Sequence, residues 1–195
     1  MYKESSIIYF DNSGPENTEV ALRAALKRAG ELGIDHIVVA SGKGGTALKL
    51  ISLAKEDGYR GGVVVISSHA GFFKPGQIEL SPEVRTQLEK EGASVFMGTH
   101  ALSSVSRSFR VQWRGIDMLE TIAETLRRFS QGVKTGIEIS IMAADAGLIP
   151  VDRDVIAIAG KSSGADSAIV LRPAHMNSFF DLKVREIIAM PRDQS

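Results

Sequence analysis

Residues 37–66, IVVASGKGGTALKLISLAKEDGYRGGVVVI, decide the fold. The apolar runs at 37–40 and 63–66 show no polar alternation, which is typical of strands covered on both faces of a sheet. The stretch between them carries Ala47, Ile51 and Ala54 at helical spacing. A buried strand, a glycine-rich turn, a helix and a second buried strand together form the βαβ unit of a parallel sheet.

The same alternation continues on both sides of this unit. We predict further strands at 6–10, 94–97, 155–159 and 167–171, and a last, edge strand at 186–190. Helices are predicted from Thr18 to a stop at Gly33, from Ser81 to about Gly92, and at 116–129, with Val20 on the inner face of the first. The stretch 98–114 is predicted to be a long polar loop.

The segment 133–146 allows two interpretations. Its core, IEISI at 137–141, alternates like a strand, but Val133, Ile137 and Ile141 also recur at helical spacing. Helix-forming residues continue to the glycine at 147, so we predict a helix. Glu138 on this helix either faces a pocket or belongs to a polar stripe.

Composition narrows the class of protein. A chain of 195 residues with 44% apolar residues fits a single domain spanning 1–195. Lys plus Arg and Asp plus Glu are 23 each, so no global charge attracts nucleic acid or an anionic membrane, and neither partner is expected. The absence of cysteine excludes disulfides, thiolate metal sites and a cysteine nucleophile. No apolar run approaches the ~18 residues of a membrane span, so we expect a soluble, cytoplasmic protein.

The loop Ser41–Thr46, SGKGGT, gives the strongest functional signal. Loops at the carboxyl ends of parallel strands form ligand sites, and here glycines allow the backbone to approach an anion at a helix N-terminus. Ser41, Thr46 and Lys43 add donors and charge, which suits a phosphate. The loop matches neither the Walker nor the dinucleotide pattern, but its Ser-x-x-Gly-x-Thr spacing resembles the phosphate loop of flavodoxins. The alternative is that the glycines only make a tight turn.

Three further loops are expected at the same edge, at 67–77, 98–108 and 160–167. They bring His69, His100 and the segment GKSSGADS, in which Asp166 either contributes to a site or holds its own turn. No carboxylates lie near the histidines at ligand spacing, so no metal is expected. The candidate cofactor-binding residues are Ser41, Gly42, Lys43, Gly44, Gly45, Thr46, His69, Ala70, Gly71, Thr99, His100, Gly160, Lys161 and Ser162.

A basic aromatic stretch lies between the third loop and the next helix. It contains Arg107, Arg110 and Arg114 with Phe109 and Trp113. Such a stretch superficially suits nucleic acid, but balanced net charge argues against that partner. We expect the arginines to be solvated or paired with acids of the 116–129 helix, and the aromatics to dock the loop or a subunit interface.

Several phrases of the sequence resemble a known family. Residues 37–67 and the late VIAIAGKSSGADSAIVLRP are similar to the C-terminal domain of pyruvate kinase. A closer resemblance, through SHAGF, THALSSVSR, EISIMAADAGLIPVDRDVIAIAG and PAHMNSFFDL, is to stand-alone archaeal-type proteins that contain a pyruvate kinase alpha/beta domain. The resemblance implies a three-layer α/β/α fold with a mostly parallel sheet. In pyruvate kinases the turn corresponding to Ser41–Thr46 grips a phosphate of an allosteric sugar bisphosphate, although Lys43 departs from the usual residue.

No pyruvate kinase activity is expected, because this chain has no room for the ~250-residue barrel that carries that chemistry. The leading hypothesis is a protein that binds a phosphorylated small molecule, with flavin mononucleotide (FMN) as the specific candidate and Phe72 and Phe73 available to lie against its ring. One alternative is a flavin-dependent or phosphosugar-handling enzyme in which His69 or His100 moves a proton. Another is an allosteric or scaffolding homo-oligomer.

Overall fold

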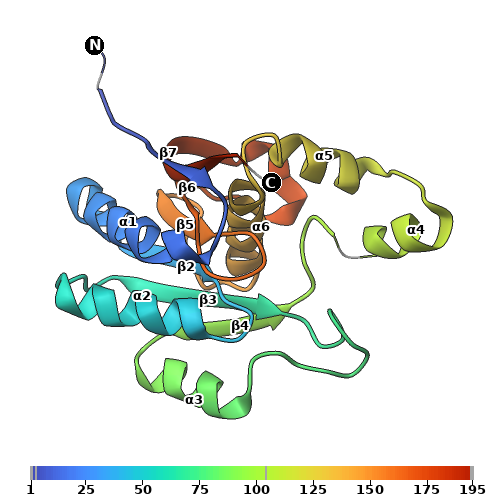
Figure 1. The fold of residues 1–195 in the computed structure, drawn as a ribbon, viewed down its shortest axis with the longest axis horizontal. Coiled ribbons are helices and arrows are strands. Elements are labelled where there is room, and N and C mark those ends of the chain that lie inside the picture. The colour runs from blue at the N-terminus through green and yellow to red at the C-terminus, as the bar shows by residue number, and fades with distance from the viewer. Residues whose placement is uncertain (1, 3, 104, 194–195) are drawn as a thin grey trace.

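A seven-stranded sheet forms the centre of the structure, a computed structural model that describes residues 2, 4–103 and 105–193. The strand order is β1-β7-β6-β5-β2-β3-β4 (Figure 1). The strands are β1 (Ile8–Asn12), β2 (His36–Ala40), β3 (Gly62–Ser68), β4 (Ser94–Gly98), β5 (Val155–Ala159), β6 (Ser167–Arg172) and β7 (Lys183–Asp193).

The sheet is mostly parallel, as predicted. β2 pairs in parallel with β3 and with β5, β3 with β4, and β1 with β7, whereas β6 runs antiparallel to both of its neighbours. The prediction that the last strand lies at an edge is wrong, because β7 lies between β1 and β6. β7 has 11 residues, and its middle residues Ile188 and Ala189 are buried.

Helices cover both faces of the sheet and produce three layers (Figure 1). One apolar core receives side chains from the helices α1 (Thr18–Leu32), α2 (Gly45–Glu56) and α3 (Pro82–Lys90). The other core, on the opposite face, receives side chains from the helix α6 (Gln131–Asp145). β2 shows why both faces are apolar, since Ile37 and Val39 enter the first core and Val38 enters the second. The α/β/α architecture is therefore confirmed.

Local signals explain several helix ends. Gly33 adopts a left-handed conformation, φ 63°, and ends α1 as predicted. The Ser81 hydroxyl accepts a hydrogen bond from the Val84 amide and begins α3. The inward placement of Val20 is wrong, because its side chain is 48% exposed and the adjacent Ala21 is buried instead.

The chain between β4 and α6 differs most from expectation. The predicted polar loop contains α4 (Ser106–Trp113), which lies away from the sheet in Figure 1, and the predicted 116–129 helix is the shorter α5 (Met118–Leu126). The stretch predicted as a helix, 133–146, is helical as far as Asp145, the last residue of α6. Two 3₁₀ segments, η1 (Pro15–Asn17) and η2 (Met176–Asp181), complete the described elements.

The topology places a crevice beside β2. From β2 the chain passes through α2 to β3 on one side, whereas from β5, on the other side of β2, it continues directly to β6, away from β2. Loops leaving β2 and β5 therefore diverge, and such a switch point is where open α/β sheets bind ligands. No helix among the described residues is long and apolar enough to cross a membrane.

Candidate functional site

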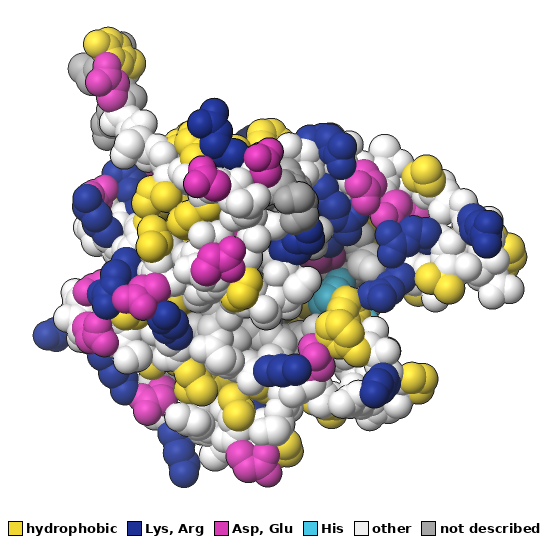
Figure 2. Space-filling view, in the orientation of Figure 1, with side chains coloured by type: hydrophobic (Ala, Val, Ile, Leu, Met, Phe, Trp, Pro, Cys, Tyr) yellow, Lys and Arg dark blue, Asp and Glu magenta, His cyan; other side chains and the backbone are white. Residues whose placement is uncertain are grey.

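A cleft of about 640 Å³ opens at the carboxyl edge of the sheet, beside β2 and β3. Its walls come from five segments: the loop 41–46, the residues 66–79, the residues 100–103 and 107–110, the stretch 127–139 and the loop 160–164. Figure 2 shows a histidine side chain in this hollow, with Lys and Arg side chains above it and hydrophobic side chains below. The switch point is therefore hollow and polar as well as accessible.

The loop Ser41–Thr46 is fixed by its own hydrogen bonds. The buried Ser41 hydroxyl accepts from the Ala47 amide at 3.2 Å, and the Ser67 hydroxyl donates to the Gly42 carbonyl at 2.9 Å. Within the part of the chain that the structure describes, the amides of Gly45 and Thr46 have no hydrogen-bond partner. These are the first two residues of α2, so two free donors and the positive end of the helix dipole meet beside the cleft.

The glycines of this loop have different roles. Gly44 has φ +90°, and a Cβ built there would lie 2.3 Å from Val84 Cγ1 of α3, so this glycine is required by packing. A Cβ at Gly45 would meet no atom within 4 Å. At Gly42 the nearest atom to such a Cβ is a Glu79 carboxylate oxygen at 2.8 Å, which places one negative charge at the rim.

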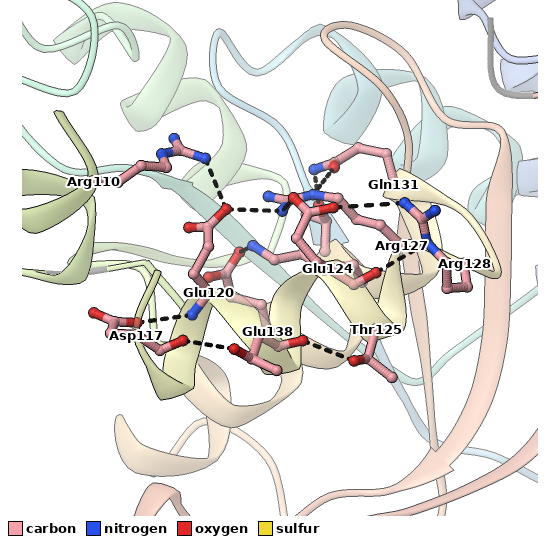
Figure 3. A network of polar contacts seen from close by, with 12 residues as sticks. Arg110, Asp117, Glu120, Glu124, Thr125, Arg127, Arg128, Gln131 and Glu138 are labelled. Atoms are coloured by element: carbon pink, nitrogen blue, oxygen red, sulfur yellow. Dashed lines mark hydrogen bonds and ion pairs between the residues drawn. The ribbon is translucent and has the colours of Figure 1, made fainter. Parts of the chain in front are cut away.

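The opposite wall of the cleft is cationic. Arg107, Arg110, Arg127 and Lys134 all line it. Figure 3 shows how acids hold two of these: Arg110 Nη1 lies 2.8 Å from a Glu120 carboxylate oxygen, and Arg127 Nη1 lies 3.5 Å from the same oxygen. The pairing of Arg110 with an acid of α5 confirms one of the two roles expected for the arginines. Arg127 also pairs with Glu124 at 2.5 Å, whereas Arg107 has no acidic partner among the described residues, so the wall keeps positive charge at Arg107.

A buried ion pair lies within this wall. Lys134 Nζ and Glu138 Oε2, one helical turn apart on α6, are 2.6 Å from each other, and each side chain is 4% exposed. The Leu102 amide donates to the other carboxylate oxygen, Glu138 Oε1, at 2.8 Å. Both residues line the cleft, so of the two interpretations left open for Glu138 the structure supports the pocket.

Aromatic rings form the end of the cleft near β3. The ring centroids of Phe72 and His100 are 4.6 Å apart, and the guanidinium of Arg107 lies 4.6 Å above the Phe72 ring. His69 packs behind His100 with centroids 5.7 Å apart, and its Nδ1 lies 2.8 Å from the Ala70 carbonyl oxygen. Burial lowers the pKa of the His100 imidazole, the nearby cations lower it further, and Glu138 opposes them. A neutral imidazole is therefore favoured in the cleft.

The loop after β5 is held by Asp166. This buried carboxylate accepts from the Ser167 hydroxyl at 2.9 Å and from the Lys161 amide at 3.4 Å. Burial raises the pKa of the Asp166 carboxyl. Asp166 therefore holds its turn, one of its two expected roles, and it also lines the smaller cavity described next, so its contribution to a site stays a prediction. A smaller cavity of about 350 Å³, lined by Lys161 and Ser162 among others, adjoins this loop and shares Arg127 with the cleft.

The candidate residues fall into three groups. Those that line the cleft are Ser41, Gly42, Lys43, Gly45, Thr46, His100, Gly160 and Ser162. Lys161 lines the adjoining cavity instead. The remaining candidates, Gly44, His69, Ala70, Gly71 and Thr99, are outside the lining of both.

Other residues of the site were not anticipated from sequence, above all Arg127, Gln131 and Lys134. Lys134 could have been found from the sequence, because a lysine and a glutamate lie four residues apart on an otherwise apolar helix. The expectation that Phe109 and Trp113 dock the loop is wrong, because they pack on each other at 4.9 Å and are 49% and 66% exposed. Their alternative role in a subunit interface stays a prediction.

Comparison with known proteins gives limited information. No family model matches the chain. One solved structure with a similar arrangement is described as "Cryptosporidium parvum pyruvate kinase in complex with ADP", at 18% sequence identity and a TM-score of 0.35. The match covers 89% of this chain and 24% of that chain, so this chain spans about a quarter of the length of the matched structure. A similarity of this size identifies neither ligand nor activity.

Proposed function

We propose that this protein binds a phosphorylated small molecule in the cleft, with its phosphate on the loop Ser41–Thr46 and FMN as the specific ligand. The observation that carries the proposal is the pair of free amides at Gly45 and Thr46, which open onto a cleft with a cationic opposite wall. Free amides at a helix N-terminus and nearby guanidinium groups are both suited to a phosphate.

The charge balance of the lining supports an anionic ligand. Five basic side chains line the cleft against two carboxylates, Glu79 and Glu138. Glu138 is paired with Lys134, and Glu79 lies beside Gly42. The chain as a whole has no net charge, so this excess is local to the cleft.

Size and aromatic content support a ligand with a planar ring. A volume of about 640 Å³ is within the range of small-molecule and cofactor sites. Phe72, Phe73 and His100 line one end, where a flat ring system could pack on their faces. The Ser-x-x-Gly-x-Thr spacing of Ser41–Thr46 adds the resemblance to flavodoxin phosphate loops.

We also propose that the chain is an archaeal-type relative of the pyruvate kinase C-terminal domain. The phrases quoted above, such as EISIMAADAGLIPVDRDVIAIAG, support this proposal, and the α/β/α architecture is compatible with it.

An absorbance spectrum from about 300 to 550 nm, taken on freshly purified protein, tests the flavin proposal. Acid release followed by mass spectrometry identifies the bound molecule. Oxidised-flavin bands with FMN recovered support the proposal. A colourless protein that also fails to bind added FMN refutes the flavin, and titration with inorganic phosphate then tests the phosphate loop by itself.

A further inference from the structure

Lys134 is unusual among the cations of the cleft because it is almost completely buried. Its side chain is 4% exposed, whereas those of Arg110 and Arg127 are 46% and 25% exposed. Burying an ammonium group is costly unless it is paired and hydrogen-bonded. The burial of Lys134 therefore requires a more specific explanation than adding positive charge to the cleft.

The partners of Lys134 satisfy only part of its hydrogen-bonding capacity. An ammonium group has three donors, and among the described residues its one partner is Glu138 Oε2. Both oxygens of the carboxylate have a partner, because Glu138 Oε1 accepts from the Leu102 amide. Glu138 therefore holds the ammonium group in place, and two donors of a buried side chain are left at the wall of a cleft.

The position of Lys134 relative to the phosphate loop indicates what these donors bind. Lys134 belongs to α6, which packs on one face of the sheet, and the loop Ser41–Thr46 leads to α2 on the other face. Both line the same cleft, with His100 and Phe72 in the lining as well. A ligand anchored by its phosphate on the loop would thus present its other end to Lys134.

We propose that Lys134 is a ligand-binding residue that donates hydrogen bonds to an oxygen acceptor, such as a carbonyl, on the non-phosphate end of the ligand. The inference rests on the proposed function and defines the ligand class further: a phosphate monoester that carries an acceptor oxygen on its ring or chain. FMN meets this description through its ring carbonyls. Glu138 is a positioning residue, because it acts through Lys134.

Paired titrations of FMN and inorganic phosphate test this assignment. Lys134→Met alone would leave the Glu138 carboxylate buried and unpaired, so the double variant Lys134→Met, Glu138→Gln is the appropriate protein. We expect it to bind FMN roughly 10- to 100-fold more weakly, the effect of losing a charge-assisted hydrogen bond. Affinity for inorganic phosphate should stay within about twofold, because phosphate alone needs only the loop.

The matched control removes a second ion pair remote from the cleft. Arg28 and Glu186 join at 2.8 Å between α1 and β7 and line neither cavity. The variant Arg28→Met, Glu186→Gln should keep the FMN affinity of the natural protein. Equal FMN affinity in all three proteins would overturn the role of Lys134. Failure of the natural protein to bind either probe would instead refute the proposed function.

Pyridoxal 5′-phosphate tests Lys134 without assuming a flavin, because it combines a phosphate with an aldehyde. The Lys134 ammonium group would first pass one proton to Glu138, the neutral nitrogen would then attack the aldehyde carbon, and the aldehyde oxygen would leave as water with the two remaining protons. Borohydride then supplies hydride to the C=N carbon, and peptide mass mapping locates the adduct.

We expect an adduct on Lys134 that inorganic phosphate suppresses. The exposed Lys49 and Lys55 are internal controls, whose labelling phosphate should leave unchanged. Labelling of exposed lysines alone, in protein shown to bind phosphate, would overturn the proposal even if FMN is not the ligand.

Discussion

The hydroxyl of Ser41 accepts a hydrogen bond from the backbone amide of Ala47 and so joins the end of β2 to the first turn of α2. This contact satisfies one of the amides that a helix N-terminus leaves unpaired and fixes the curve of the loop between them. The amides of Gly45 and Thr46, which precede Ala47, have no hydrogen-bond partner among the described residues, and both residues line the cleft.

Removing the Ser41 hydroxyl should therefore destabilise the protein. Ser41→Ala leaves the Ala47 amide without its acceptor, which costs about 1–2 kcal/mol of unfolding free energy. Urea denaturation measures this change. Ser52→Ala, at an exposed position of the same helix, is the control and should change stability by less than about 0.5 kcal/mol. Similar losses in the two variants would mean that the hydrogen bond has no special role.

Two adjacent glycines should respond oppositely to alanine. Gly44→Ala forces a side chain into a left-handed conformation and against Val84, so we expect a loss of at least about 1–3 kcal/mol. Gly45→Ala meets open space in the first turn of a helix, where alanine is favoured by up to about 1 kcal/mol. Thermal or urea unfolding compares the two. If Gly44→Ala leaves the unfolding free energy unchanged, the described packing of the loop against α3 is incorrect.

The buried ion pair on α6 should be costly to break and inexpensive to remove. Lys134→Met strands the Glu138 carboxylate, with an expected loss of about 3–5 kcal/mol. Adding Glu138→Gln should recover most of this loss, because no buried charge remains and the amide oxygen can still accept from Leu102. Unfolding measurements on both single variants and the double variant give the coupling energy. Additive effects would indicate that the two side chains do not interact.

His100 should make stability fall on mild acidification. Its folded-state pKa lies below the ordinary value of 6.5, mainly because of burial, so in acid the unfolded chain takes up a proton that the folded protein resists. Stability contributed by the neutral imidazole is then lost as the pH falls from about 6.5 towards the folded-state pKa. In His100→Gln, urea midpoints between about pH 6.5 and 5 should depend less steeply on pH. Equal slopes in the two proteins would contradict the lowered pKa.

Much of the fold could be predicted because its signals are local. Buried strands such as 37–40 are apolar on both faces, and Gly33 and Ser81 mark helix ends by their own chemistry. The position of the last strand could not be predicted, because its pairing between β1 and β6 depends on contacts distant in sequence. α4 was missed because its polar, exposed residues resemble those of a loop.

The site also has one part that could be predicted from the sequence and one part that could not. The loop Ser41–Thr46 is contiguous, so composition and spacing identify it as a candidate. The opposite wall depends on how α5 and α6 return across the sheet, which brings Arg127 and Lys134 to a loop more than 80 residues earlier in the chain. Short-range sequence patterns cannot predict that these side chains lie at the same cleft as the loop. The four-residue spacing of Lys134 and Glu138 nevertheless identifies Lys134 as a candidate.

FMN titration into the natural protein and two glycine variants is the decisive experiment. Gly45→Asp puts a carboxylate at the free amides without a steric clash, and Gly30→Asp puts the same side chain into open space on α1. If the phosphate lies on Ser41–Thr46, Gly45→Asp should weaken FMN binding at least about tenfold through lost amide contacts and charge repulsion, and Gly30→Asp should bind like the natural protein. Undiminished FMN affinity in Gly45→Asp would show that the ligand's phosphate does not lie on this loop.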